Sequence, residues 1–313
     1  MTSYSAQGLV LKKTKLGETD LIITLLAATG HQIRAVAKGA RKPGSQTASR
    51  LELFSLVDLL LHQGRSLDVV TEVRLVEANR ECRAEPERMA SAAVLCEFLE
   101  TVTREADVEP RLYPMACEAL RFVGSVAPEG LSMMLAAALF KFAGQIGYLP
   151  AVGECALCGM PAAACENDEE CYRWLVFEGG LVCHECSESQ NLNFELDQQD
   201  AGFSTLSAGS GLYDKDRHEK PPHDNARYDK DRSEAISPEE SWVSAALLGW
   251  LQMCIAARFK DIEKAINENS SAQSKTNIAA LGTTLLGFAQ EWIESHLSLR
   301  LKSMKFLRDF LPK

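Results

Sequence analysis

Short runs of apolar residues, separated by turn residues, fill the first eighty positions of the chain. Thr29-Gly30 and Gln63-Gly64 supply turns between consecutive runs, as closely spaced antiparallel strands require. Five strands in this length fit the small β-barrel of an OB-fold. The expected strands cover residues 7–13, 21–27, 31–38, 54–61 and 67–76.

From residue 83 the apolar residues recur every three or four positions, which predicts helices packed on one side. Pro86, Pro110 and Pro128 each stand where a helix can begin, because proline suits the first turn of a helix and breaks its interior. Gly147 and Pro150 are expected to end the third helix. The predicted core positions are Met89, Ala93, Cys96 and Leu99, then Leu112, Met115, Ala119 and Val123, then Leu131, Leu135, Leu139, Phe142 and Ile146.

A second helical stretch is expected to start at residues 237–240, where the sequence SPEE combines a capping serine, a first-turn proline and a capping-box acid. A final helical region should run from Ile278 towards Phe310, with a bend near Ser298. The apolar side of the first of these helices is expected to contain Trp242, Ala246, Leu247, Trp250, Leu251 and Cys254.

Residues 197–236 are polar and lack an apolar period, which predicts a flexible insert. The pentapeptide YDKDR occurs at residues 213–217 and again at 228–232, and we interpret it as a local duplication in a solvated linker. The sequence therefore predicts an α+β protein with an N-terminal OB-fold β-barrel at residues 1–80. An all-helical domain follows in two parts, at 81–153 and 237–313, and a cysteine-rich module at 154–190 emerges from it.

The net charge of −10 is unevenly distributed. Residues 1–50 carry eight Lys and Arg against two acidic residues, a net charge of +6, which leaves −16 on the other 263 residues. A basic end on an acidic body is typical of a protein in which one module meets a polyanion. A solvated run of charge would give the same distribution, so charge alone leaves both interpretations open.

With 46% apolar and 24% charged residues, the composition is that of an ordinary globular protein. Its longest apolar stretch, around residues 131–143, is interrupted by Ser132 and Lys141 and falls short of the roughly 20 residues needed to cross a bilayer. The N-terminus lacks the apolar region and cleavage site of a signal peptide. We therefore expect a cytoplasmic protein that contacts no membrane.

Two pairs of cysteines form a C-x2-C-x24-C-x2-C pattern, which is typical of tetrahedral zinc. The expected ligands are Cys155, Cys158, Cys183 and Cys186. The gap between the pairs can hold a β-hairpin, with residues 172–177 as a strand and Gly179-Gly180 as the turn. We expect one zinc ion with a structural role, because four thiolates leave no position for a catalytic water.

Three further residues remain alternative ligands: Cys165 and Cys171 inside the gap, and His184 between the last two cysteines. Since cytosolic thiols are kept reduced, the other cysteines are not expected to form disulfides. Buried positions in helices are predicted for Cys82, Cys96, Cys117 and Cys254. The chain carries no phosphate loop, dinucleotide-binding glycine motif or hydrolase signature, so we expect a protein that is not an enzyme.

Basic residues of the predicted barrel are candidates for binding nucleic acid. Arg34 and Lys38 lie four apart on one face of a predicted strand, and residues 38–42 (KGARK) are expected to form a flexible basic loop. Such side chains suit phosphates and give sequence-independent, salt-sensitive binding. The barrel candidates are Arg34, Lys38, Arg41, Lys42, Lys12 and Lys13.

A second basic strip lies near the C-terminus, at Arg300, Lys302, Lys305 and Arg308. It has two interpretations. Either these residues extend the nucleic-acid surface, or they are the solvated side of an amphipathic helix that docks in the core. The apolar side of that helix would contain Leu301, Met304, Phe306 and Leu307.

Four segments, in order along nearly the whole chain, resemble the RecO family. Residues 17–26 (GETDLIITLL) and 30–41 (GHQIRAVAKGAR) resemble its N-terminal signature. Residues 140–150 (FKFAGQIGYLP) resemble its junction between helix and zinc finger, and residues 299–307 (LRLKSMKFL) its C-terminal segment. The chain departs from the family in the polar insert, for which the family provides no role.

This resemblance implies a mediator of DNA repair and homologous recombination. It implies an OB-fold that binds single- and double-stranded DNA, annealing of complementary strands, and help in loading recombinase onto DNA coated with single-stranded-DNA-binding protein. That protein and RecR are the implied partners, and the cytoplasm, at the nucleoid, is the implied location.

Two other classes of protein share some of these features. A zinc-ribbon factor of the translation or transcription machinery would have the same barrel and basic face, and a hydrolase would use the metal. Annealing of DNA strands without nucleotide would distinguish the mediator from the zinc-ribbon factor, whereas zinc-dependent turnover would indicate the hydrolase.

Overall fold

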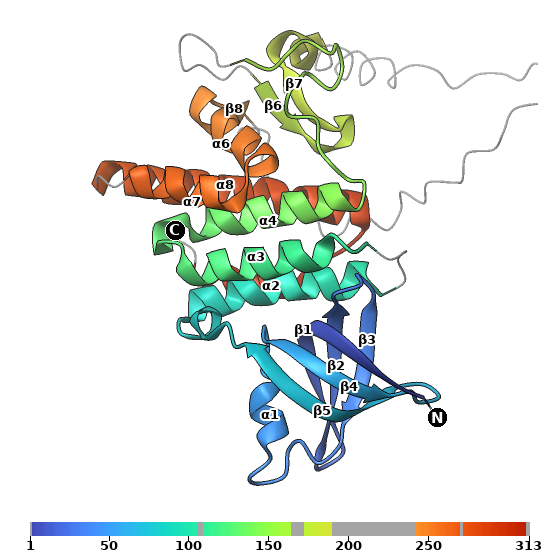
Figure 1. Cartoon of the computed structure of the whole chain (residues 1–313). Helices are drawn as coiled ribbons and strands as arrows, with labels where there is room; N and C mark the ends of the chain where they lie inside the picture. The colour runs from blue at the N-terminus through green and yellow to red at the C-terminus, as the bar shows by residue number, and fades with distance from the viewer. Residues whose placement is uncertain (1, 105–108, 164–171, 190–241, 270–271, 311–313) are drawn as a thin grey trace, which may run out of the picture.

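The structure is a computed structural model that describes residues 2–104, 109–163, 172–189, 242–269 and 272–310. The predicted insert at 197–236, with its repeated pentapeptide, lies outside these residues. A β-barrel, a layer of helices and a small cysteine-rich sheet follow one another from one end of the molecule to the other (Figure 1). Among the described helices, none has an apolar stretch sufficient to span a bilayer.

Five strands form the N-terminal barrel: β1 (Ser3–Leu16), β2 (Asp20–Ala27), β3 (Gln32–Ala37), β4 (Leu56–His62) and β5 (Asp68–Glu77). They close in the order β1-β2-β3-β5-β4, which confirms the predicted OB-like barrel. Neighbouring strands are antiparallel except at the seam between β3 and β5, where Ala35 pairs with Asp68 and Val36 with Val69 in parallel. The short helix α1 (Gln46–Arg50) lies between β3 and β4 in the chain.

The helical part of the structure surrounds one apolar helix. Its elements are η1 (Arg80–Arg83), α2 (Pro86–Val102), α3 (Leu112–Ser125), η2 (Pro128–Gly130), α4 (Leu131–Gln145), α6 (Ala245–Ala256), α7 (Phe259–Glu268), α8 (Ala272–Leu297) and α9 (Lys302–Arg308). Every residue of α4 from Leu131 to Phe140 is buried. A Cβ on Gly282 of α8 would lie 2.8 Å from the backbone nitrogen of Met133, so glycine allows α8 to approach α4 closely.

The three helices predicted after the barrel are confirmed, and so is the bend between α8 and α9, where Ser298 has a φ of 49°. Gly147, with a φ of 94°, follows the end of α4 as predicted. One apolar-stripe position in α2 and one in α6 are wrongly assigned, because the helices turn them towards solvent. Met89 of α2 is 40% exposed, and Ala246 of α6 is also exposed.

The helix expected from residues 237–240 begins later than predicted. Residues 237–241 lie outside the described part of the chain, and Trp242 belongs to the short strand β8 (Trp242–Val243) rather than to the helix. Helix α6 begins at Ala245 because the side chain of Ser244 accepts a hydrogen bond from the amide of Leu247. The capping serine is therefore Ser244.

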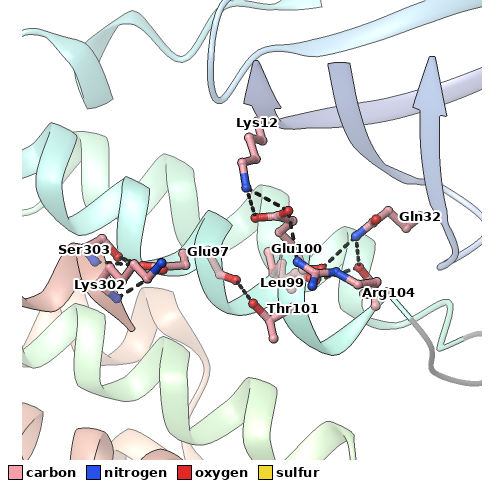
Figure 2. Close-up of polar contacts among 10 residues, drawn as sticks. Lys12, Gln32, Glu97, Leu99, Glu100, Thr101, Arg104, Lys302 and Ser303 are labelled. Atoms are coloured by element: carbon pink, nitrogen blue, oxygen red, sulfur yellow. Dashed lines mark hydrogen bonds and ion pairs between the residues drawn. The ribbon is translucent and has the colours of Figure 1, made fainter. Parts of the chain in front are cut away.

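Helix α2 fastens the barrel to the other helices. The ammonium of Lys12 on β1 lies 3.0 Å from the carboxylate of Glu100, and the side chain of Gln32 on β3 donates to the Glu100 carbonyl at 2.7 Å (Figure 2). Barrel residues also enter the helical core, among them Leu9, Leu26 and Phe54. These residues join the barrel to the helical core, while the inside of the barrel forms a second apolar core that includes Ile23, Leu25 and Val57.

The cysteine-rich segment forms the predicted hairpin and gains a third strand from much later in the chain. Strands β6 (Tyr172–Leu175) and β7 (Gly180–Cys183) are joined through the 3-10 turn η3 (Val176–Glu178), and β8 pairs with β6. The predicted Gly179-Gly180 turn is confirmed, with φ angles of 94° and 139°. The first strand ends at Leu175, two residues earlier than predicted.

Trp174 of β6 joins this sheet to the helices. Its ring stacks on Phe288 of α8, with centroids 5.1 Å apart and 8° between the planes, and meets Phe140 of α4 edge-on at 5.9 Å. Only 2% of Trp174 is exposed. The sheet is therefore packed into the helical core through this side chain.

Replacing Trp174 by Ala should lower the free energy of unfolding by about 3–5 kcal/mol, because it leaves a large cavity between β6, α4 and α8. Equilibrium urea denaturation of the full chain measures this change. Phe177→Ala is the matched control, since Phe177 lies three residues further along the chain and is 84% exposed. Its effect should stay within about 0.5 kcal/mol. Equal losses in the two variants would contradict the packing described here.

Candidate metal centre and nucleic-acid interface

The two cysteine pairs meet at one end of the hairpin. The four Sγ atoms of Cys155, Cys158, Cys183 and Cys186 all lie within 4.8 Å of one another. The first pair stands on a tight turn, in which the amide of Gly159 donates to the carbonyl of Cys155 at 2.9 Å and Gly159 has a φ of 72°. Strand β7 delivers Cys183, whose amide lies 3.3 Å from the sulfur of Cys155. The four cysteines could together hold one metal ion.

The thiols of this cluster differ in pKa, because burial and hydrogen bonding act differently on each of them. Burial alone would raise the pKa of Cys155, but hydrogen bonds from the backbone of Cys158 and Cys183 outweigh it and lower that pKa to about 6. Hydrogen bonding with the thiols of Cys183 and Cys158 raises the pKa of Cys186 to about 12. Burial also raises the pKa of Cys183. A cation at the centre would supply the charge that four thiolates require.

The structure describes one of the three alternative metal ligands. His184 is not a member of the cluster: its ring centroid lies 5.6 Å from that of Trp242, and its Nε2 atom lies 3.7 Å from the carboxylate of Glu188. Cys165 and Cys171 lie outside the described residues. The remaining cysteines, Cys82, Cys96, Cys117 and Cys254, are buried and unbonded to one another, as predicted.

The basic residues of β3 and the loop after it stand on the outside of the barrel. Arg34 is exposed between the buried residues Ile33 and Ala35, and Lys38 is exposed directly after the end of β3. Four residues of extended chain place their Cα atoms about 13 Å apart. Arg34 and Lys38 thus stand apart along one edge of the barrel.

The basic loop at residues 38–42 is hydrogen-bonded to the barrel, so the prediction of a flexible loop is wrong. The amide of Gly39 donates to the carboxylate of Asp20 at 2.8 Å, and the amide of Arg41 donates to the carbonyl of Thr19 at the same distance. The guanidinium of Arg41 donates to the carbonyl of Gly17 at 3.0 Å. The hydrogen bond from Gly39 also lowers the pKa of Asp20.

Lys12 and Lys13 of β1 differ from the residues of the loop because both form ion pairs. Lys12 pairs with Glu100 of α2, and the ammonium of Lys13 lies 2.9 Å from the carboxylate of Glu52. The Lys13 side chain is only 19% exposed. Both charges are therefore partly neutralised within the protein.

The C-terminal strip lies on α9 and the segment before it. Leu301, Met304 and Leu307 are buried, whereas Phe306, which was assigned to the same side, is 47% exposed. Helix α9 packs against α2, where the Glu97 carboxylate accepts hydrogen bonds from the amides of Lys302 at 3.1 Å and Ser303 at 2.8 Å (Figure 2). Core docking of α9 is thus observed. The basic residues Arg300, before the helix, and Lys302, Lys305 and Arg308, on it, are exposed, and the guanidinium of Arg308 donates to the side chain of Gln290 at 3.0 Å.

Comparison with known proteins assigns the chain to a family. Residues 1–79 match the model described as "Recombination protein O N terminal", and residues 83–212 match "Recombination protein O C terminal". The chain belongs to the RecO family. A DNA repair protein RecO from Thermobifida fusca (strain YX) is 36% identical over 188 residues, which cover 59% of this chain and 74% of the relative.

The two RecO models meet at the junction seen in the structure. The first ends just after β5, and the second begins just before α2 and includes all four clustered cysteines. Membership of the RecO family favours the recombination interpretation over a translation or transcription factor.

Two arginines that the sequence did not single out also lie near Arg34. Arg65 stands in the turn between β4 and β5, and Arg104 lies just beyond the end of α2; both line a pocket with Arg34. The Gly64-Arg65 sequence in a predicted turn was a usable signal for the first. The second had no sequence signal, because its place depends on how α2 packs against the barrel.

Replacing Cys155 and Cys158 together by Ser should remove bound metal and loosen the hairpin, because a sheet with four-residue strands depends on metal binding for much of its order. Metal content of the purified protein by mass spectrometry, and protease sensitivity of the hairpin, measure the two effects. Cys117→Ser/Cys254→Ser is the control for loss of two thiols. Full metal retention in the Cys155 and Cys158 variant, or loss of metal after replacing Cys165 and Cys171, would show that the ligands are wrongly assigned.

Proposed function

We propose that this RecO-family protein is a mediator of homologous recombination that binds single- and double-stranded DNA and anneals complementary strands. It would also help to load recombinase onto DNA coated with single-stranded-DNA-binding protein. Family membership assigns the chain to DNA repair and recombination. The observation that carries the proposal is a closed OB-like barrel, matched by the RecO N-terminal model, with exposed basic residues along β3.

The proposed DNA surface begins at β3 and continues into the loop that follows it. Arg34, Lys38, Arg41 and Lys42 would contact phosphates, which are the same at every sequence, so binding would be general and sensitive to salt. The hydrogen bonds to Asp20 and Gly17 fix the loop backbone at Gly39 and the guanidinium of Arg41 before DNA arrives. Such preorganisation lowers the entropic cost of binding.

The other basic residues would contribute less to DNA binding. Lys12 and Lys13 would add positive potential, reduced by their partners Glu100 and Glu52. Arg300, Lys302 and Lys305 would extend the surface across the far side of α2, where α9 is docked. The proposed division is a DNA-binding barrel at residues 1–80, a helical domain at 81–153 and 237–313, and a metal module at 154–190.

The proposed metal is one structural zinc. Tetrahedral zinc with metal–sulfur bonds of about 2.3 Å places its ligand sulfurs about 3.8 Å apart. The sulfurs of Cys158 and Cys183 are 3.8 Å apart. Four thiolates would fill the coordination sphere, which fits a protein that is not an enzyme.

The proposed partners are RecR and single-stranded-DNA-binding protein, in the cytoplasm and at the nucleoid. Support for protein partners comes from charge, because the chain beyond residue 50 carries −16 and would be repelled by DNA. Repulsion of that kind would keep DNA on the barrel and leave the rest of the surface to proteins.

The variant Arg34→Ala/Lys38→Ala/Arg41→Ala should bind DNA more weakly at all sequences, and annealing of strands coated with single-stranded-DNA-binding protein should slow with it. Each lost phosphate contact should lower the slope of log affinity against log salt by about 0.7 on single strands and 0.9 on duplexes. Fluorescence anisotropy across a salt series and a strand-annealing assay measure these effects.

A matched control removes three other arginines that already pair with carboxylates: Arg74, Arg121 and Arg258. It changes the net charge equally and should leave binding nearly unchanged. If the barrel variant kept its affinity and salt slope while replacement of Arg300, Lys302 and Lys305 abolished binding, the main DNA surface would lie on α9 instead. Absence of annealing by the unaltered protein would refute the proposed function.

A further inference from the structure

A pocket of about 460 Å³ opens at the seam of the barrel, beside the end of α2. It lies between the start of β3 and the turn that joins β4 to β5. Its lining is mostly polar and includes three arginines and one carboxylate: Arg34, Arg65, Arg104 and Asp68. The start of β3, with Arg34, therefore borders a recess that residues 38–42 do not line.

The turn that carries Arg65 is fixed by hydrogen bonds to Asp68. The carboxylate accepts one from the hydroxyl of Tyr4 and another, at 3.1 Å, from the amide of Gly64. Burial and the neighbouring carboxylate raise the pKa of Tyr4 to about 12, so its hydroxyl remains a donor. The one carboxylate of the pocket is thus engaged within the protein, and Arg65 projects from a braced turn.

Arg104 brings the helical part of the protein to the same pocket. Its guanidinium lies 3.3 Å from the carboxylate of Glu100, which also pairs with Lys12 (Figure 2). The side chain of Gln32 donates to the carbonyl of Glu100 and holds this end of α2 against β3. By contrast, the guanidinium groups of Arg34 and Arg65 have no hydrogen-bond or ion-pair partner among the described residues.

We propose that this pocket binds one nucleotide of a single DNA strand, with its phosphate held by Arg34 and Arg65. Arg104 continues the path of the strand from the barrel onto the end of α2. The assignment rests on the proposed function and adds a composite site that the barrel alone does not contain. It names Arg65 and Arg104 as binding residues beside Arg34.

The pocket's chemistry selects a single strand. Arginine pairs of this kind hold phosphate oxygens through several N–H donors in a fixed geometry. The volume lies within the usual range of about 300–1,000 Å³ for pockets that hold a small ligand. A duplex is too stiff to turn one nucleotide into a recess, whereas a single strand can do so and can place its base against the rings of His31 and Tyr4.

Arginine footprinting tests the site on the full chain. Phenylglyoxal modification, read by peptide mass spectrometry, is compared with and without an oligothymidine strand. We expect the strand to protect Arg34, Arg65 and Arg104 severalfold. Arg74 serves as the internal control, because it stands on β5 outside the pocket and pairs with Asp58; its reactivity should not change.

A single substitution measures how much Arg65 contributes to DNA affinity. Arg65→Ala should weaken binding to oligothymidine about fivefold at ~0.1 M salt and lower the salt slope by about 0.7, as expected for one lost phosphate contact. Arg74→Ala, with the same loss of charge on the same barrel, should match the unaltered protein in both quantities.

The outcomes separate this inference from the proposed function. If the unaltered protein binds oligothymidine but Arg34 and Arg65 stay unprotected and Arg65→Ala keeps its slope, the pocket assignment is overturned and the proposed function stands. Equal protection by a polyglutamate peptide would also overturn it, because the pocket would then belong to acidic protein segments. Failure of the unaltered protein to bind any DNA would remove both.

Discussion

Helix α4 has no polar side to leave in water, and other elements must therefore cover it on every side. Helices α2, α3, α6, α7 and α8 all pack against it. Its one charged residue, Lys141, is partly buried, and its ammonium donates to the carbonyl of Ile255 at 2.8 Å. Burial lowers the pKa of that group. Because burial of apolar surface stabilises a protein by about 25 cal/mol per Å², covering α4 determines the positions of its neighbours.

The same core reaches both ends of the molecule. Leu9 and Phe54 enter it from the barrel, and Trp174 enters it from the hairpin that carries the cysteines. The barrel and the cysteine-rich sheet are thus held at opposite ends of the helical layer (Figure 1). The proposed DNA-binding face and the four-cysteine cluster do not share residues, so a bound metal would act on the fold of its own end rather than on DNA contacts.

Features encoded by local pattern could be predicted from the sequence. Short apolar runs between turn residues predicted the five barrel strands, and the C-x2-C spacing predicted four cysteines whose sulfurs lie within 4.8 Å of one another. Strand β8 could not be found, because it has two residues and exists only through pairing with β6, about seventy positions earlier in the chain. The apolar period likewise misplaced Met89 and Phe306, since a period shows which side of a helix is apolar but not how far its neighbours cover it.

The sequence also leaves undecided how much positive charge stays unpaired on the folded surface. Two carboxylates of α2 have a large effect on it. Glu100 takes up the charge of Lys12, and Glu97, one turn earlier, accepts the amides of Lys302 and Ser303 at the start of α9. The Lys12–Glu100 ion pair is of a kind that contributes little to stability, in general about 0–1 kcal/mol, but the two carboxylates lower the positive potential of the surface around them. Net charge along the chain therefore overstates the basic surface that folding leaves open. On the barrel, that surface includes Lys15 of β1, the outer side of β3, the loop after it and the turn that carries Arg65.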